Sequence, residues 1–145
     1  MPIANYTTTV PVSRTLAEVQ AMLVSGGAQS VMIDFVDGLP AAMSFLMVRG
    51  PLRLTFRLPC DWRAAQQVLL SDKRTRSYAT DEHAQRVAWR VLRDWLRAQL
   101  ALIEIGAAAF EQVMLPYIVT PTGETLYARL SERHFKLLEF AGDAV

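Results

Sequence analysis

The chain has 145 residues, of which 52% are hydrophobic, and this amount of apolar material predicts one domain that spans residues 1–145. No apolar run reaches the ~20 residues of a membrane-spanning helix, and the N-terminal residues lack the pattern of a secretion signal. We therefore expect a cytoplasmic protein without a membrane partner. Cys60 is the single cysteine, which excludes an intrachain disulfide and a zinc site with two thiolates.

The formal net charge of +1 is unevenly distributed along the chain. Residues 49–97 contain eleven Lys or Arg against five Asp or Glu, a balance of +6. Residues 1–48 have a balance of −2, and residues 98–145 have a balance of −3. If the chain binds an anionic partner, we expect the binding surface to lie in residues 49–97.

The first elements expected are a strand and a helix. The β-branched run "NYTTTVPV" predicts a strand over Tyr6–Val12. Thr15 and Glu18 have the spacing of a capping box, and Gly26-Gly27 ends the helix that follows. The predicted apolar stripe of this helix consists of Leu16, Val19, Met22 and Leu23.

Three more strands are expected in the next part of the chain. "SVMIDFV" alternates, "DGLP" predicts a turn, and "AAMSFLMV" is nearly all apolar, as in a central strand covered on both faces. "LRLTFRLP" alternates strictly. Its inward residues are Leu52, Leu54, Phe56 and Leu58, and its outward residues are Arg53, Thr55 and Arg57.

Helices dominate the remainder. Asp61 caps a short helix to Leu70, and a basic connection then leads to a long helix that Thr80 caps and that reaches about Ile105. Gly106 interrupts it before a further helical stretch to Leu115, and residues 126–140 predict one or two short amphipathic helices. The order β-α-β-β-β-α-α predicts an α+β fold in which a mainly antiparallel sheet of about four strands packs against the long helix.

The long helix predicts where the core lies. Trp89 and Trp95 are on its apolar side, and we expect Leu92, Trp95 and Leu96 to share one core with the inward residues of "LRLTFRLP". The small residues of "GAAAFEQVML" predict a flat helical surface through which the chain forms a homo-oligomer.

Four arginines of the long helix form an arginine ridge within a ~60° sector: Arg86, Arg90, Arg93 and Arg97. One hypothesis is that the ridge binds the phosphates of DNA or RNA. Arg53, Arg57, Arg74, Arg76 and Tyr78 would extend this binding surface. A second hypothesis is a solvated face whose arginines pair with Asp94, Glu104 or neighbouring acids, and a third is an interface for a protein partner.

Candidate catalytic groups are sparse. Cys60 with His83 or His134 would be a thiol–imidazole pair, and Asp34 with Asp37 would bind magnesium, but no spacing in the sequence supports either site. Residues 81–83, "DEH", are explained by the electrostatics of a helix start. The chain also lacks a phosphate-binding glycine loop, so an enzyme ranks third among the functional hypotheses, after a nucleic-acid-binding protein and an interaction module, and we expect no cofactor and no metal.

Residues 75–130 resemble a family of small uncharacterised proteins of phages and integrative mobile elements. The resemblance is carried by "RVAWRVLRDWLRAQLALIEIG", "VMLPY" and "TPTGETLY". It implies an accessory protein of a phage or mobile element, and it transfers no activity or site residue. The first functional hypothesis is a nucleic-acid-binding accessory protein; the alternative is an interaction module or inhibitor that binds a host or element-encoded enzyme.

Overall fold

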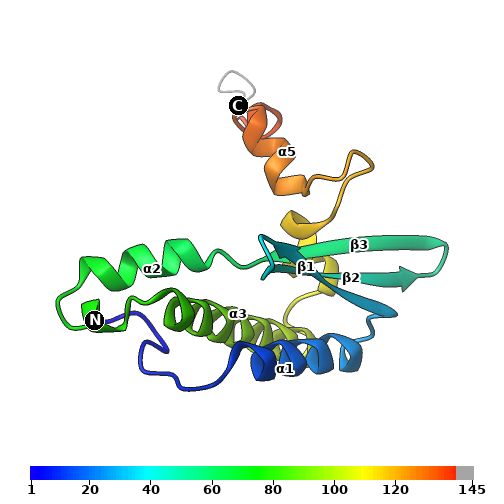
Figure 1. Ribbon diagram of the computed structural model, residues 1–145. Helices are drawn as coiled ribbons and strands as arrows, with labels where there is room; N and C mark the ends of the chain where they lie inside the picture. Colours follow the sequence, from blue (N-terminus) through cyan, green and yellow to red (C-terminus); the bar gives the residue numbers. More distant parts are fainter. Residues whose placement is uncertain (140–145) are drawn as a thin grey trace.

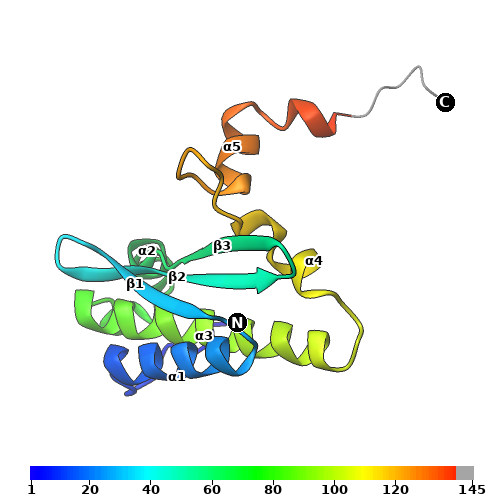
Figure 2. The ribbon, with the colours of Figure 1, turned by 90° about the vertical axis from the view of Figure 1, so that its right-hand side faces the viewer.

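A computed structural model describes residues 1–139 and shows an antiparallel sheet that lies against a layer of helices (Figures 1 and 2). α1 and α3 run side by side beneath the sheet, α2 packs against α3, and α5 projects away from this body. The α+β prediction is confirmed, and residues 140–145 of the predicted domain lie outside the described part. In chain order, with η for a 3-10 helix, the elements are α1 (Val12–Ser25), β1 (Ser30–Val36), β2 (Leu39–Arg49), β3 (Leu52–Pro59), α2 (Trp62–Ser71), η1 (Arg76–Tyr78), α3 (Asp81–Glu104), α4 (Phe110–Met114), η2 (Leu115–Tyr117), α5 (Leu126–Glu132) and η3 (Lys136–Leu138).

The sheet has three strands in the order β1-β2-β3, one fewer than the four expected. β2 is central, as its apolar sequence predicts, and Met43 pairs with Ile33 of β1 and with Leu58 of β3. The expected turn at "DGLP" forms through Asp37 and Gly38, whose φ values of 52° and 77° are those of a tight hairpin turn.

The expected strand at Tyr6–Val12 does not form. The chain turns there instead, with Thr8 N donating to Asn5 O at 3.0 Å. Pro11 then has a φ of −61° and is the N-cap of α1. Because proline fixes this φ and cannot donate to a strand ladder, it outweighs the β-branched composition before it. The order of the larger elements is therefore α-β-β-β-α-α.

The predicted capping box of Thr15 and Glu18 is wrong, because Pro11 starts α1 earlier. Both residues lie inside the helix, where Thr15 is fully buried and Glu18 faces α3. Most of the predicted apolar stripe is confirmed as buried: Leu16, Val19 and Leu23. The helix ends at Gly26, the C-cap, as expected.

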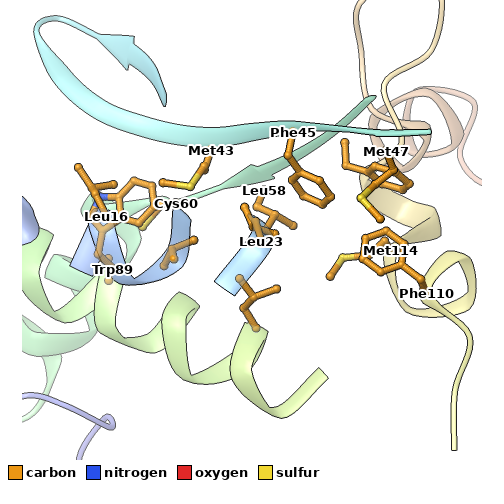
Figure 3. Packing of buried hydrophobic residues seen from close by; sticks show 14 of the residues in the cluster. Leu16, Leu23, Met43, Phe45, Met47, Leu58, Cys60, Trp89, Phe110 and Met114 are labelled. Carbon is orange, nitrogen blue, oxygen red and sulfur yellow. The ribbon is translucent and has the colours of Figure 1, made fainter. Parts of the chain in front are cut away.

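The apolar core lies between the sheet and the helices and draws on elements that are far apart in the sequence (Figure 3). Phe45 stacks on Phe56 at 5.1 Å between ring centroids, and Phe110 meets both rings edge-on. Trp89 is fully buried, as predicted, while Trp95 packs against Tyr117 at the margin of the core. Residues labelled in Figure 3 come from α1 (Leu16, Leu23), β2 (Met43, Phe45, Met47), β3 (Leu58), the residue that follows β3 (Cys60), α3 (Trp89) and α4 (Phe110, Met114).

The alternation of β3 is confirmed except at its first residue. Phe56 and Leu58 are fully buried, and Leu54 packs against the same core as Leu92 and Leu96 of α3. Leu52, also predicted to face inward, is 56% exposed because it adjoins the β2–β3 turn.

The predicted helix caps are both present. Asp61 accepts a hydrogen bond from Ala64 N at 3.0 Å and starts α2. Thr80 Oγ1 accepts from His83 N at 3.2 Å and starts α3, which continues to Glu104 as expected. Side-chain caps of this kind satisfy backbone donors that have no partner within the helix.

Residues 106–115 differ from the expected helical stretch. Gly106 has a φ of 81° and ends the long helix, and α4 begins only at Phe110. Phe110 and Met114 are buried in the core of their own chain. The flat helical surface predicted for self-association in "GAAAFEQVML" therefore does not form.

Residues 126–139 contain the expected short helices, and Phe140, the last residue of that prediction, lies outside the described part. Within residues 1–139, none of the helices combines the length and the apolar character needed to cross a lipid bilayer.

Two leucines of one strand provide a matched test of this core. Leu58→Ala should lower the free energy of unfolding by about 2–5 kcal/mol, because it empties a fully buried site. Leu52→Ala should cost less than about 0.5 kcal/mol. Urea denaturation of both variants measures the difference, and equal costs would contradict the assignment of Leu52 to the surface.

Candidate functional site

The central part of the arginine ridge, Arg90 and Arg93, lies where α3 packs along α1; the two helices run side by side in Figure 1. Arg86, Arg90 and Arg93 are half-buried, and Arg97 is exposed. The start of α3 at Thr80 fixes the rotation of the helix, and the core contact of Trp89 holds the ridge beside α1. Two of the four ridge arginines, Arg90 and Arg93, are thus part of a helix–helix contact.

Glu18 of α1 forms ion pairs with the two central arginines and accepts a hydrogen bond from Arg90. Arg90 Nη1 donates to Glu18 Oε2 at 2.6 Å, and Arg93 Nε lies 3.2 Å from the same oxygen. The Arg90 and Arg93 side chains are only 14% and 21% exposed. Arg90 Nη1 also lies 3.4 Å from Thr15 Oγ1. Charges that would repel one another along the ridge are thereby neutralised within the chain.

Asp94 extends this network on the solvent side. Arg93 Nη1 donates to Asp94 Oδ1 at 3.0 Å, and Asn5 Nδ2 donates to Asp94 Oδ2 at 2.9 Å. Two carboxylates therefore face two guanidinium groups, which agrees with the hypothesis of internal pairing. Glu104, the other acid expected to take part, forms no ion pair within residues 1–139.

These contacts change the acidity of both carboxyl groups. The hydrogen bond from Arg90 lowers the pKa of Glu18, desolvation opposes it, and the nearby charges of Arg90, Arg93 and Arg14 lower it further. Desolvation acts to raise the pKa of Asp94, but the hydrogen bonds from Asn5 and Arg93 outweigh it, so that this pKa is also lowered. Both groups are ionised at neutral pH.

Arg86 contacts His83 of its own helix, and His83 in turn binds the N-terminal segment. His83 Nε2 lies 2.5 Å from the Tyr6 carbonyl oxygen and Arg86 Nη2 lies 3.4 Å from His83 Nδ1. Because a carbonyl only accepts, Nε2 carries the proton and Nδ1 accepts from the guanidinium. Arg86 Nε is buried without a hydrogen-bond partner among the described residues.

The predicted residues of the α2–α3 connection also have intramolecular contacts. Arg74 binds Asp72 with two hydrogen bonds, of 3.1 and 2.8 Å. Arg76 Nε donates to the Leu70 carbonyl at 3.2 Å. Tyr78 is half-buried and meets the Tyr6 ring edge-on at 5.5 Å, an arrangement typical of packing.

The outer face of the sheet carries the two strand arginines. Arg57 Nη1 donates to the Gly123 carbonyl at 3.0 Å, and its Nε lies 3.8 Å from Asp34 Oδ2. Ser44 Oγ donates to Asp34 at 2.6 Å beside it. Arg53 is exposed on the same face, nearer the β2–β3 turn.

Arg97 is the exposed end of the ridge. It borders a cleft of about 710 Å³ that Met22 of α1, Leu100 of α3 and Phe110 also line. Arg49 borders this cleft as well, but its Nε lies 3.2 Å from Glu111 Oε1. Among the described residues, Arg97 has no carboxylate oxygen within 4.0 Å.

The predicted nucleic-acid residues are thus divided among several places. Arg90 and Arg93 meet at Glu18, Arg86 lies beside His83, and the other members lie on the sheet, in the α2–α3 connection or at the cleft. Sequence reasoning missed Glu18, whose position three residues after Thr15 had been interpreted as a cap. Nucleic-acid contact by these residues stays a prediction.

The candidate catalytic residues are also accounted for by local structure. Burial, followed by the charge of Asp61, raises the pKa of the Cys60 thiol to about 12, so it is protonated at neutral pH. His83 holds the Tyr6 carbonyl, as described above. Across residues 1–139, no group of three His, Cys, Asp or Glu side chains has the arrangement of a metal site.

A C-terminal arm, defined here as residues 118–139, leaves the body of the protein (Figures 1 and 2). Its base is anchored on β3, where Val119 N donates to the Thr55 carbonyl at 2.8 Å and Arg57 reaches Gly123. Beyond this base α5 contacts η2. The large exposed hydrophobic residues of the arm are Tyr127, Phe135, Leu137 and Leu138.

The arm also forms a groove of about 430 Å³ with a mixed lining. Three apolar and three basic side chains surround it: Leu126, Leu130, Leu137, Arg129, Arg133 and Lys136. Tyr127 and Phe135 pack on each other with ring centroids 5.9 Å apart. This combination can bind an apolar side chain and an acidic group together.

Comparisons of the chain with protein-family models, curated proteins and solved structures give no match. The resemblance of residues 75–130 to proteins of phages and mobile elements therefore stays a prediction.

The Glu18 contact predicts a loss of stability that an exposed acid does not share. Glu18→Gln should lower the free energy of unfolding at pH 7 by about 1–3 kcal/mol, because two largely buried guanidinium groups lose the carboxylate that neutralises them. Glu104→Gln, at an exposed position on α3, should cost less than about 0.5 kcal/mol. Chemical denaturation compares the two variants with the parent, and equal costs would argue against the ion pair.

The same contact predicts a pH dependence. A carboxyl whose pKa is lowered by folding contributes stability above its ordinary pKa of about 4.3, and this contribution is lost as the pH falls through the lowered value. The stability difference between parent and Glu18→Gln should be constant near neutral pH and shrink below about pH 4.3. Denaturation midpoints measured at a series of pH values test this, and a difference that persists in acid would contradict it.

Proposed function

We propose that this protein is an interaction module that binds an acidic, amphipathic helical segment of another polypeptide through its C-terminal arm. The observation that carries the proposal is the exposed apolar surface of the arm, where Leu137 alone is 83% exposed. Clustered apolar side chains that extend from a folded body into solvent are typical of an interaction site.

The charge of the groove selects the kind of partner. Arg129, Arg133 and Lys136 surround its apolar floor, and the Lys136 ammonium has one weak contact, with Glu139 at 3.5 Å. A helix that places leucines at intervals of three and four residues, with acids beside them, would satisfy both parts of the groove. Neutral apolar segments would leave the basic rim without partners.

Nucleic-acid binding through the arginine ridge is the competing hypothesis. Phosphates at Arg90 and Arg93 would have to replace Glu18, which already forms an ion pair with each of them. Phosphate binding also gives no reason for the exposed apolar residues of the arm. For these two reasons we favour the protein partner.

The resemblance to phage and mobile-element proteins gives this function a context. The partner would be a host or element-encoded enzyme, which the module recruits or inhibits through an exposed acidic helix. A module of this kind needs a stable body and an accessible docking element, and the Arg57 contact with the Gly123 carbonyl fixes the base of that element.

Fluorescence anisotropy with defined probes tests the proposal. The probes are a labelled amphipathic peptide with a Leu stripe and Glu on its other positions, a scrambled peptide of equal composition, and single- and double-stranded oligonucleotides. The amphipathic peptide should bind more tightly than its scrambled control. Leu137→Glu and Arg133→Glu should each weaken binding at least about tenfold, equivalent to 1.4 kcal/mol.

Met32→Glu is the matched control, since Met32 is exposed on β1 and should not affect peptide binding. Failure of the amphipathic peptide to outbind the scrambled one would overturn the proposal. Oligonucleotide binding that decreases steeply with salt and is unaffected by Leu137→Glu would establish the competing hypothesis instead.

A further inference from the structure

α3 carries an apolar stripe whose members alternate at intervals of four and three residues. They are Ala84, Ala88, Val91, Trp95, Ala98, Leu102 and Ile105. At 100° per residue these positions lie within an arc of about 100°. This alternation is typical of a helix that packs lengthwise against another helix.

The chain covers only the first part of this stripe. Ala84 is buried with Leu69 and Val87 under Ile3 and Tyr6. Val91, Leu102 and Ile105 are exposed, and Ile105 is the most exposed of them at 75%. The apolar stripe thus continues toward the end of α3, beyond the part that other residues of the described chain bury.

A groove marks the point at which the cover ends. It has a volume of about 450 Å³, and Val91 and Trp95 of α3 line it together with Ala64 and Val68 of α2 and Ile3. Ala98 lies seven residues after Val91 and seven before Ile105. The recess at Val91 and the protruding Ile105 are therefore each about 10 Å along the helix from Ala98, in opposite directions.

We propose that a second copy of this chain covers the stripe, with the two α3 helices antiparallel about a twofold axis beside Ala98. Each Ile105 then occupies the other copy's groove at Val91 and Trp95, so that one surface complements itself, as a twofold interface requires. The small side chain of Ala98 lets the helices approach closely at the axis.

The charges beside the stripe permit this contact. Asp94 flanks it, and Arg93 at 3.0 Å neutralises Asp94 within the same chain. The dimer uses no residue of the C-terminal arm, so it goes beyond the proposed function and can fail or succeed independently of it.

Sedimentation velocity of the full chain over a range of micromolar concentrations measures the assembly. The parent should form dimers, and Ala98→Arg should raise the dissociation constant at least about tenfold, because it places two like charges at the axis. Met32→Arg, on the exposed face of β1, should dimerise as the parent does. A parent that remains monomeric throughout, or a dimer unaffected by Ala98→Arg, would overturn the proposal.

Cysteine cross-linking in a Cys60→Ala background tests the antiparallel orientation; the native thiol is removed because Cys60 lines the groove that Ile105 would enter. Under mild oxidation, Val91→Cys mixed with Ile105→Cys should give a disulfide-linked dimer. Each variant alone should give little. Efficient cross-linking of the single variants in place of the mixture would indicate parallel helices and contradict the proposed dimer.

Discussion

The contact of Glu18 with Arg90 and Arg93 is the constraint on which the arrangement of the helices depends. It joins α1, the first helix, to α3, the longest one, across a separation of more than seventy residues in the chain. Apolar packing between these helices is compatible with some sliding, whereas a carboxylate shared by two guanidinium groups has one favourable position. Apolar packing thus holds α1 and α3 together, and the ion pair fixes their position along one another.

The same contact explains how half-buried arginines can lie where two helices of a small protein pack together. Guanidinium groups are seldom buried without acids, because the cost of desolvation exceeds what packing returns. Here Glu18 and Asp94 balance two of the ridge arginines, and the histidine at the start of α3 accepts from a third. Only Arg97, at the end of the ridge, is fully turned to solvent.

Local signals predicted the local structure well. Asp61 and Thr80 cap their helices as the sequence indicates, since a cap depends on residues within one turn. The error at Tyr6–Val12 arose because strand propensity has no effect without a neighbouring strand, and Pro11 offered a helix start instead. Glu18 could not be assigned to Arg90 from sequence, because the assignment requires the packing of α1 on α3. The exposure of the C-terminal arm could not be predicted either. The apolar side chains of residues 126–139 predict one or two short amphipathic helices, but the sequence does not show whether these helices pack on the rest of the chain.

The anchor of the arm has an asymmetry that bears on how the sequence can vary. Arg57 binds the main-chain carbonyl of Gly123, so the acceptor persists whatever side chains the neighbouring turn residues carry. Gly123 itself has a φ of 91°, which restricts that one position to glycine. The other residues of the turn can therefore vary while the arm stays attached. Substitutions of Arg57 or Gly123, the two residues that form the contact, should be the ones that disturb it.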